Sequence, residues 1–223
     1  MSAREIGESI PPASVLVAGI DGSGKSTFLE QLGLLEYIVH EPTVTPMARN
    51  FKQASLNRLL DSDFISERES LYLGLNDKFD ASIRESLENG RKVATSGNTL
   101  VTLLSHTVMR AIVSDSQPEG ITKSVINQWL SADCFKPEAL VLVHAPESVI
   151  LERILERQRS GDRAEEFWGF NSPYFLQRYQ AEWRQMVDAI KEEVGIICLD
   201  FDSGTVSPPE MREIYSRQVH LAR

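Results

Sequence analysis

Residues 19–27 read GIDGSGKST and directly follow the apolar run 15–18. The stretch fits the pattern Gly-x4-Gly-Lys-(Ser/Thr), in which glycines let backbone N–H groups converge on phosphate oxygens. An apolar run before such a loop indicates a buried strand, and a helix after it adds its positive dipole end to the anion site. The sequence therefore predicts a strand–loop–helix unit that binds phosphate groups, against the alternative of a glycine-rich turn without a ligand.

Several residues of this phosphate loop have expected roles. Lys25 is expected to reach the outer phosphates, and the hydroxyl of Ser26 is expected to bind Mg²⁺. Phosphates would repel a carboxylate, so Asp21 is expected to face a sugar hydroxyl or metal-bound water, or else to be favoured only by the helix dipole. The expected nucleotide-binding residues are Gly19, Asp21, Gly22, Ser23, Gly24, Lys25, Ser26 and Thr27.

The charge balance limits the partners of the chain. It has 223 residues, with 23 Lys and Arg against 32 Asp and Glu, and a formal net charge of -9. A nucleic-acid backbone or an anionic membrane requires a basic face, so this charge argues against both as partners. No apolar run approaches the roughly 18 residues that a membrane span needs. Cys134 and Cys198 follow no metal-ligand spacing, and reduced thiols in the cytoplasm are expected.

Short apolar runs alternate with longer segments of helical periodicity. Five runs are candidates for buried parallel strands: 15–18, 37–39, 93–95, 139–143 and 196–199. This alternation is typical of an α/β fold, here a parallel five-stranded sheet with crossover helices on both faces. Residues 13–223 are expected to form a single domain behind a flexible tail, residues 1–12. The second run is expected beside the first, which would place Glu41 at the carboxyl edge of the sheet, where ligands bind.

The clearest helix is predicted over residues 66–89. Ser66 followed by Glu69 fits a capping box, and Gly90 suits a left-handed helix end. Apolar residues then recur every four positions and predict one buried stripe, formed by Leu71, Leu75, Phe79, Ile83 and Leu87. Two more helices are predicted over residues 146–159 and 173–193.

Two specific segments resemble thymidylate kinases, which are P-loop nucleoside monophosphate kinases related to the deoxynucleoside kinases. The loop GIDGSGKST is similar to the family's Gly-x-Asp-Gly-x-Gly-Lys-Ser-Thr loop, whose Asp lies near the sugar hydroxyl of the acceptor. HEPTVTPMARNFK, residues 40–52, resembles the family's Arg-Glu-Pro-Gly-Gly-Thr-Pro-Leu-Ala-x-x-x-Arg segment. It matches at Glu41, Pro42, Thr45, Pro46 and Ala48, with Lys52 in place of the final Arg.

Two later segments resemble the same family more weakly. Residues 137–167 are similar to its strand, helix and arginine-bearing lid, and residues 175–183 to the helix that follows. The resemblance thus extends over about residues 15–202. It implies a sheet of the P-loop NTPase type with a lid segment.

The segments that bind the acceptor phosphate in the family differ in this chain. After the third predicted strand the family carries Asp-Arg-Tyr, whereas this sequence has Ser96, Gly97 and an Asn. In the preceding helix, Tyr72 takes the place of a base-stacking aromatic and Asn76 that of a phosphate-binding Arg, although a shift of one residue is also compatible. His106 falls near a base-reading Gln. The donor end therefore resembles the family and the acceptor-phosphate end does not.

Four arginines follow one another on or after one predicted helix. Arg153 and Arg157 share a face of that helix because they are four residues apart. A predicted lid over about residues 157–168 would neutralise the transferring phosphoryl group with Arg157, Arg159 and Arg163. The alternative is a solvated face of alternating charge.

Further residues are candidates on the acceptor side. Glu41 is expected to act as a general base for a hydroxyl acceptor or to hold metal-bound water, unless Glu-Pro is only turn chemistry. Lys52, matched to the family's Arg, is expected to bind the acceptor. Tyr72 and His106 would contact the acceptor base, and core packing is the alternative for both.

The resemblance implies a phosphotransferase that uses ATP and Mg²⁺ and acts on a nucleoside monophosphate, with dTMP as the first candidate. A deoxynucleoside kinase is one alternative, because those enzymes share the fold and need no arginines for an acceptor phosphate. A protein that binds ATP with lost or altered kinase activity is another, because the family's Asp-Arg pair is missing. Family members usually dimerise through helices on one side of the sheet, so a homodimer is also considered.

Overall fold

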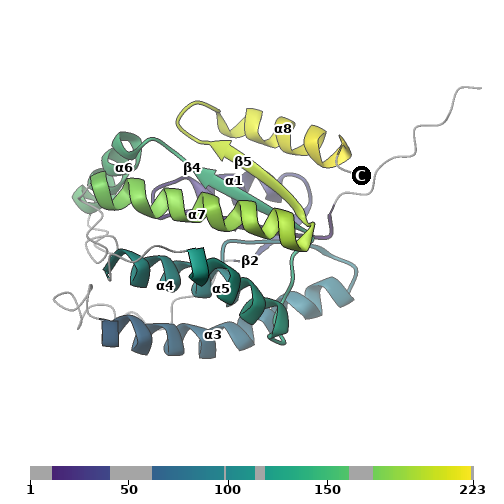
Figure 1. The fold of residues 1–223 in the computed structure, drawn as a ribbon. Helices are drawn as coiled ribbons and strands as arrows, with labels where there is room; N and C mark the ends of the chain where they lie inside the picture. Colours follow the sequence, from purple (N-terminus) through teal and green to yellow (C-terminus); the bar gives the residue numbers. More distant parts are fainter. Residues whose placement is uncertain (1–11, 41–61, 98, 114–118, 161–172, 222–223) are drawn as a thin grey trace, which may run out of the picture.

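The computed structural model describes residues 12–40, 62–97, 99–113, 119–160 and 173–221. Figure 1 shows a central sheet between layers of helices. Its strands are β1 (Ser14–Ala18), β2 (Tyr37–His40), β3 (Lys92–Thr95), β4 (Ala139–His144) and β5 (Ile197–Asp202). All the strands predicted from the sequence are present, with ends that differ by three residues or fewer.

The strands are parallel and lie in the order β2-β3-β1-β4-β5. This order confirms the predicted α/β fold. One expectation is wrong, because β2 pairs with β3, and β3 separates it from β1. Apolar runs identify strands, but the crossover connections decide which strands become neighbours. Glu41, next in sequence after β2, lies outside the described residues.

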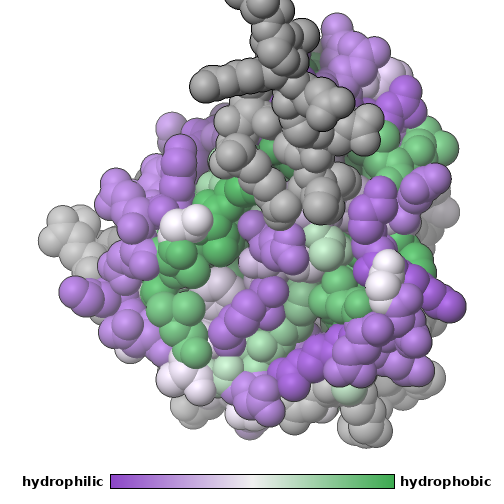
Figure 2. Space-filling model, turned by 90° about the vertical axis from the view of Figure 1, so that its right-hand side faces the viewer, coloured by the Kyte–Doolittle hydropathy of each residue, from purple (hydrophilic) through white to green (hydrophobic). Residues whose placement is uncertain are grey.

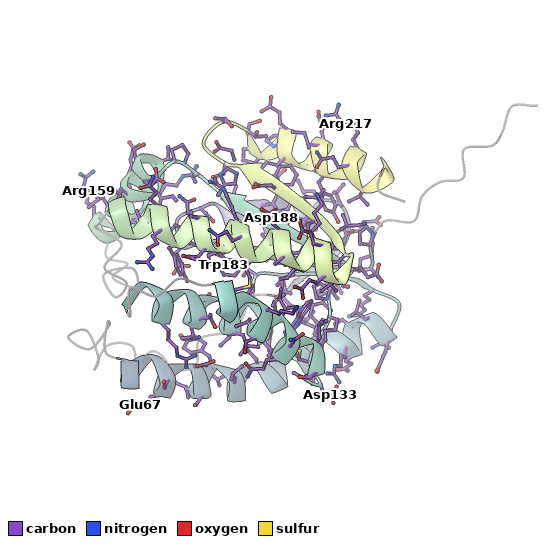
Figure 3. All side chains as sticks on the ribbon, in the orientation of Figure 1. Glu67, Asp133, Arg159, Trp183, Asp188 and Arg217 are labelled. Atoms are coloured by element: carbon purple, nitrogen blue, oxygen red, sulfur yellow. The ribbon has the colours of Figure 1, made fainter. Side chains whose placement is uncertain are left out.

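Helices cover both faces of the sheet. Those of the described part are α1 (Lys25–Gly33), α3 (Ser62–Glu88), α4 (Thr99–Val113), α5 (Glu119–Ser131), α6 (Glu147–Arg159), α7 (Pro173–Val194) and α8 (Pro208–Leu221). Leu16 of β1 packs into the core that α4, α5 and α7 share, whereas Val15 and Val17 pack into the core under α1 and α8. Figure 3 places Trp183 where α7 faces α4 and α5, and its side chain is 1% exposed. Cover on both faces explains why β1 and β4 are apolar along nearly their whole length.

The ends of α3 agree only in part with the prediction. The helix begins at Ser62, so Ser66 and Glu69 lie inside it and the predicted capping box is wrong. The residues before Ser66 are already helical, which leaves no N-cap role for its hydroxyl. Gly90 follows the end of α3 with a φ of 72°, as the left-handed helix end requires.

The buried face of α3 also differs from the predicted stripe. Of the stripe, Ile83 is buried and the other four residues are half-buried. The polar side chains of Asn76 and Asp80 are more deeply buried, at 4% and 3% exposure. The face of α3 that packs against α4 therefore includes buried polar residues. The spacing of apolar residues in the sequence does not predict their burial.

Gly74 interrupts the outer face of α3. It is exposed, and an added Cβ atom would meet nothing within 4 Å. Gly74→Ala is expected to raise the free energy of unfolding by about 0.5 to 1 kcal/mol, because alanine loses less backbone entropy in a helix. Urea unfolding followed by circular dichroism measures this change. A loss of stability would show that the residue has a contact that the structure does not contain.

The described part of the chain begins at a buried residue, Pro12. Pro12, assigned to the tail from the sequence, is buried, and its carbonyl oxygen accepts a 2.8 Å hydrogen bond from the hydroxyl of Tyr37. Residues 1–11 lie outside the described residues.

No helix in the described segments is long and apolar enough to cross a membrane. Figure 2 shows hydrophilic residues over much of the face where the strands begin.

Candidate functional site

The phosphate loop joins the carboxyl end of β1 to the start of α1. Gly19 has a φ of 136°, and a Cβ atom there would lie 2.2 Å from the carbonyl oxygen of Val143 in β4. Gly24 is the N-cap of α1 with a φ of 101°. Glycine suits both positions because an L side chain is strained at positive φ, and at Gly19 it has no room either. The predicted strand–loop–helix unit is therefore present.

Lys25 begins α1 and turns its ammonium group back toward the loop. Its Nζ donates to the carbonyl oxygen of Ile20 at 2.8 Å and to Oδ1 of Asp21 at 3.4 Å. The side chain of Lys25 is 16% exposed and that of Asp21 is 46% exposed. The structure thus brings these two predicted site residues together. A phosphate would be a stronger partner for the ammonium group than a backbone carbonyl.

The hydroxyl groups of the loop differ in exposure. Ser26 and Thr27 are exposed in the first turn of α1. Ser23 is fully buried, and its Oγ has no hydrogen-bond partner among the described residues. Ser26 is therefore accessible to a metal ion and Ser23 is not. In the described segments, no group of three or more His, Cys, Asp or Glu side chains could hold a metal ion.

Arg153 of α6 and Ser203, just after β5, contact the outside of the loop. Nη1 of Arg153 donates to the carbonyl oxygen of Gly22 at 3.1 Å and to Oγ of Ser203 at 2.8 Å, and Nη2 donates to the carbonyl oxygen of Ser203 at 2.9 Å. The hydroxyl of Ser203 donates in turn to the carbonyl oxygen of Ser23 at 2.5 Å. Sequence reasoning placed Arg153 on a helix face with Arg157 and missed Ser203, since no pattern connects residues so far apart in the chain.

A cavity of about 320 Å³ opens beside the loop. Three parts of the chain line it: the loop and α1 (Gly22, Gly24, Thr27), α6 (Arg153, Glu156, Arg157), and the segment after β5 (Ser203, Val206, Pro208, Met211). Its volume lies in the range of small-molecule pockets, and its wall combines apolar surface with cations and hydroxyl groups.

The predicted lid arginines lie at the end of α6. Arg157 is half-buried and lines the cavity. Arg159 is exposed and lies at the outer margin of the molecule in Figure 3. Arg163 and the acceptor candidate Lys52 lie outside the described residues. Of the two lid arginines that the structure describes, Arg157 therefore lies at the cavity beside the phosphate loop.

The residues matched to the acceptor base and phosphate lie between α3 and α4. The ring centroids of Tyr72 and His106 are 6.1 Å apart. Nδ1 of His106, a residue 3% exposed, lies 2.8 Å from the carbonyl oxygen of Thr102. Asn76 donates to the hydroxyl of Thr102 at 2.7 Å. His106 and Asn76 thus have hydrogen-bond partners in the interior, while Tyr72 is half-buried.

An ion pair lies farther along the same helix interface. Arg110 of α4 donates from Nη2 to Oε2 of Glu69 on α3, and the Glu69 side chain is 13% exposed. Burial lowers the pKa of Arg110, although a guanidinium group stays charged in proteins. Glu69 therefore pairs with α4 instead of capping its own helix.

The turn after β3 carries no charge at Ser96 and Gly97. The hydroxyl of Thr95 donates to the carbonyl oxygen of Gly97 at 2.9 Å and accepts from its N–H at 3.2 Å. Gly97 is buried and Ser96 is half-buried. The backbone at this turn is thus tied to the strand end, at the place where the resembling family has Asp and Arg.

His144 ends β4 and contacts two other elements. Its Nε2 lies 2.8 Å from Oδ1 of Asp200 in β5, and its Nδ1 lies 2.9 Å from Nη2 of Arg184 in α7. A guanidinium group only donates, so Nδ1 must accept and Nε2 must carry the proton. These contacts suit the tautomer with its proton on Nε2. The sequence separated these three residues too widely to link them.

Comparison with solved structures finds three similar structures, which belong to two kinases. Deoxyadenosine kinase from M. mycoides with bound dATP matches at a TM-score of 0.61 and 13% identity, covering 92% of this chain and 98% of that one. The same enzyme with the products dCMP and dCDP matches at 0.67 and 11%, covering 93% and 99%. Thymidylate kinase from Candida albicans matches at 0.60 and 16%, covering 95% of each chain.

No family model and no curated protein sequence matches the chain. Identities this low identify a fold and not an activity. The parallel five-stranded sheet with helices on both faces agrees with the structural matches. The chain has the P-loop kinase fold that deoxyadenosine kinase and thymidylate kinase share.

Proposed function

We propose that this protein transfers the γ-phosphoryl group of Mg·ATP to a nucleoside monophosphate, with dTMP as the first acceptor. The phosphate loop carries the proposal, because its glycines and Lys25 lie next to a cavity of about 320 Å³. In open parallel sheets, ligands bind outside the carboxyl ends of the strands, where this loop lies. The likeness to two kinds of kinase structure supports phosphoryl transfer over simple anion binding.

On the donor side, the loop would hold the phosphates of ATP. The N–H groups at the start of α1 and the helix dipole favour an anion there. Lys25 would bind the outer phosphates, and Arg157, Arg159 and Arg163 would neutralise the charge that develops on the transferring group. The cavity between α6 and the segment after β5 would take the base.

Ser26 is the residue that would bind Mg²⁺. Its hydroxyl is exposed in the first turn of α1, and the carboxylate of Asp21 is about half exposed nearby. When bound, the ion supplies charge neutralisation for the phosphates. Magnesium ions in such sites take most of their ligands from phosphates and water, so one protein hydroxyl is a sufficient anchor.

The choice of dTMP rests on the segment around Glu41. Glu41 and Asp21 would orient the acceptor or metal-bound water, and Lys52 would bind the acceptor phosphate. Tyr72, half-buried beside His106, would contact the acceptor base.

A deoxynucleoside acceptor is the second candidate, and the position of Asn76 favours it. Asn76 occupies the place matched to a phosphate-binding arginine, but it is neutral, 4% exposed and hydrogen-bonded to Thr102. Ser96 and Gly97 are also neutral where the family has Asp and Arg. A monophosphate brings nearly two negative charges close to ATP, whereas a nucleoside brings none.

Phosphoryl transfer from labelled Mg·ATP tests the proposal. The panel contains the four deoxynucleoside monophosphates and the four matching deoxynucleosides, each with a reaction that lacks the acceptor. We expect labelled dTDP to form. Transfer to deoxynucleosides alone would replace the first candidate by the second. ATP binding without transfer to any acceptor would contradict both and leave a nucleotide-binding protein.

A further inference from the structure

We infer that Arg153 and Ser203 are positioning residues. They contact the outer side of the phosphate loop and hold its backbone in the conformation that binds phosphate. This role rests on the proposed function, because it concerns how the loop binds the phosphates of the donor. Neither side chain needs to touch the nucleotide for it. The two side chains and their contacts to the loop are called the brace below.

The brace joins three elements that are distant in sequence. Arg153 lies on α6, Ser203 lies between β5 and α8, and the loop follows β1. Four hydrogen bonds of 2.5 to 3.1 Å connect them, and two of these end on loop carbonyls, those of Gly22 and Ser23. The N–H of Ser203 also donates to the carbonyl oxygen of His144 at 2.8 Å, which ties the brace to the end of β4.

The direction of the loop carbonyls explains what the brace does. In a trans peptide the C=O and the following N–H point in opposite directions. Since the carbonyl of Ser23 points outward to Ser203, the N–H of Gly24 points to the inner side of the loop. A carbonyl turned inward would instead place a partial negative charge against a phosphate. At the Ser23–Gly24 peptide the brace therefore selects the orientation that an anion requires, whereas the N–H after the Gly22 carbonyl, that of Ser23, donates to the carbonyl oxygen of Ile20 at 3.2 Å.

The hydrogen-bond capacity of Arg153 argues against a direct phosphate contact. A guanidinium group has five N–H donors, two on each Nη and one on Nε. Both donors of Nη1 are used by Gly22 and Ser203, and one donor of Nη2 by the carbonyl of Ser203. Most of the fork is therefore directed at protein oxygens.

The close approach of the loop to Ser203 supports the same conclusion. A Cβ atom added to Gly24 would lie 3.1 Å from Oγ of Ser203. The glycine thus lets the brace reach the backbone. Gly22, Gly24, Arg153 and Ser203 also line the cavity, so the brace forms part of the wall of the cavity that would take the base. Losing it is expected to weaken binding of the phosphates even when no base is present.

Binding of Mg·ATP and of inorganic Mg·tripolyphosphate, measured by calorimetry, tests the brace. The variants are Arg153→Lys, which keeps the charge but loses the planar fork, and the milder Ser203→Ala. Each substitution is expected to lower the affinity for both ligands by about tenfold, which is the effect of losing one or two hydrogen bonds. The double variant is expected to lose less than the product of the two single losses, because both side chains act through one contact network. Arg217→Lys is the matched control, because Arg217 is exposed on α8 (Figure 3) and does not line the cavity.

Each other outcome overturns the inference. If Arg153→Lys loses affinity for ATP but not for tripolyphosphate, Arg153 contacts the base of ATP directly and does not position the loop. If both affinities stay unchanged in variants whose melting temperatures are lowered, the contacts only stabilise the fold. If the natural protein binds neither ligand, the proposed function fails together with the brace. Should Arg153→Lys not fold, Ser203→Ala and its tripolyphosphate affinity decide the question.

Discussion

Lys25→Ala is expected to lower the rate of phosphoryl transfer by about a thousandfold or more, because it removes the cation that meets the charge developing on the outer phosphates. The fold should tolerate the change. Nζ of Lys25 bonds to Ile20 and Asp21, and the pair with the half-exposed Asp21, long at 3.4 Å, is expected to contribute no more than about 1 kcal/mol. Steady-state transfer from labelled ATP to the accepted substrate measures the loss.

Lys191→Ala is the matched control for this variant. Lys191 lies in the last turn of α7, is exposed, and also carries one positive charge. It should leave the transfer rate within about twofold, since surface substitutions away from a site have small effects. A Lys25→Ala protein that is folded and transfers phosphate at the natural rate would remove Lys25 from the proposed mechanism.

Gly19→Ala is expected to have the largest effect on stability. The new methyl group would lie 2.2 Å from the carbonyl oxygen of Val143, so the backbone of β4 or of the loop must move. A φ of 136° is in addition a conformation that alanine rarely adopts. Backbone strain and overpacking each cost about 1 to 3 kcal/mol, so the free energy of unfolding should fall by about 3 kcal/mol or more. Urea unfolding at equilibrium measures it.

Gly90→Ala separates strain from collision. Gly90 has a φ of 72°, but an added Cβ atom there would meet nothing within 4 Å. Only the cost of a left-handed residue applies, about 1 to 2 kcal/mol. If both variants lost the same stability, the close approach of Gly19 to β4 would have no energetic consequence.

Local sequence signals identified the strands and the strand–loop–helix unit at residues 14–33 correctly. β1 and β4 are near-continuous apolar runs because both of their faces are covered, and the glycine spacing of the loop follows from its positive φ angles. The same signals misplaced the start of α3 and its buried face. A capping pattern at Ser66 and a stripe of apolar residues describe an isolated helix, whereas Asn76 and Glu69 of α3 have hydrogen-bond partners on α4.

The candidate site was predictable only where its residues are neighbours in the sequence. The loop from Gly19 to Thr27 belongs to this part. The cavity wall could not be predicted in this way. Its residues on α6 and after β5 are far from the loop in sequence, and the crossover connections of the fold bring them next to it. Acceptor positions were assigned by resemblance, and Asn76 shows the difference, since the structure gives it a buried partner in Thr102.

The sequence by itself determined the fold class and the strand–loop–helix unit around residues 19–27, and it alone led to the proposal that Lys25 is the cation of this loop. These depend on hydrophobic period, glycine conformation and spacing within a few residues, all of which are local. Only the tertiary structure decided that β3 separates β2 from β1, that Tyr72 meets His106, and that Arg153 and Ser203 hold the loop. Arg153 is 131 residues from Gly22, and Ser203 is 180 residues from Ser23. Contacts at such separations depend on how the layers pack, and no local pattern encodes that packing.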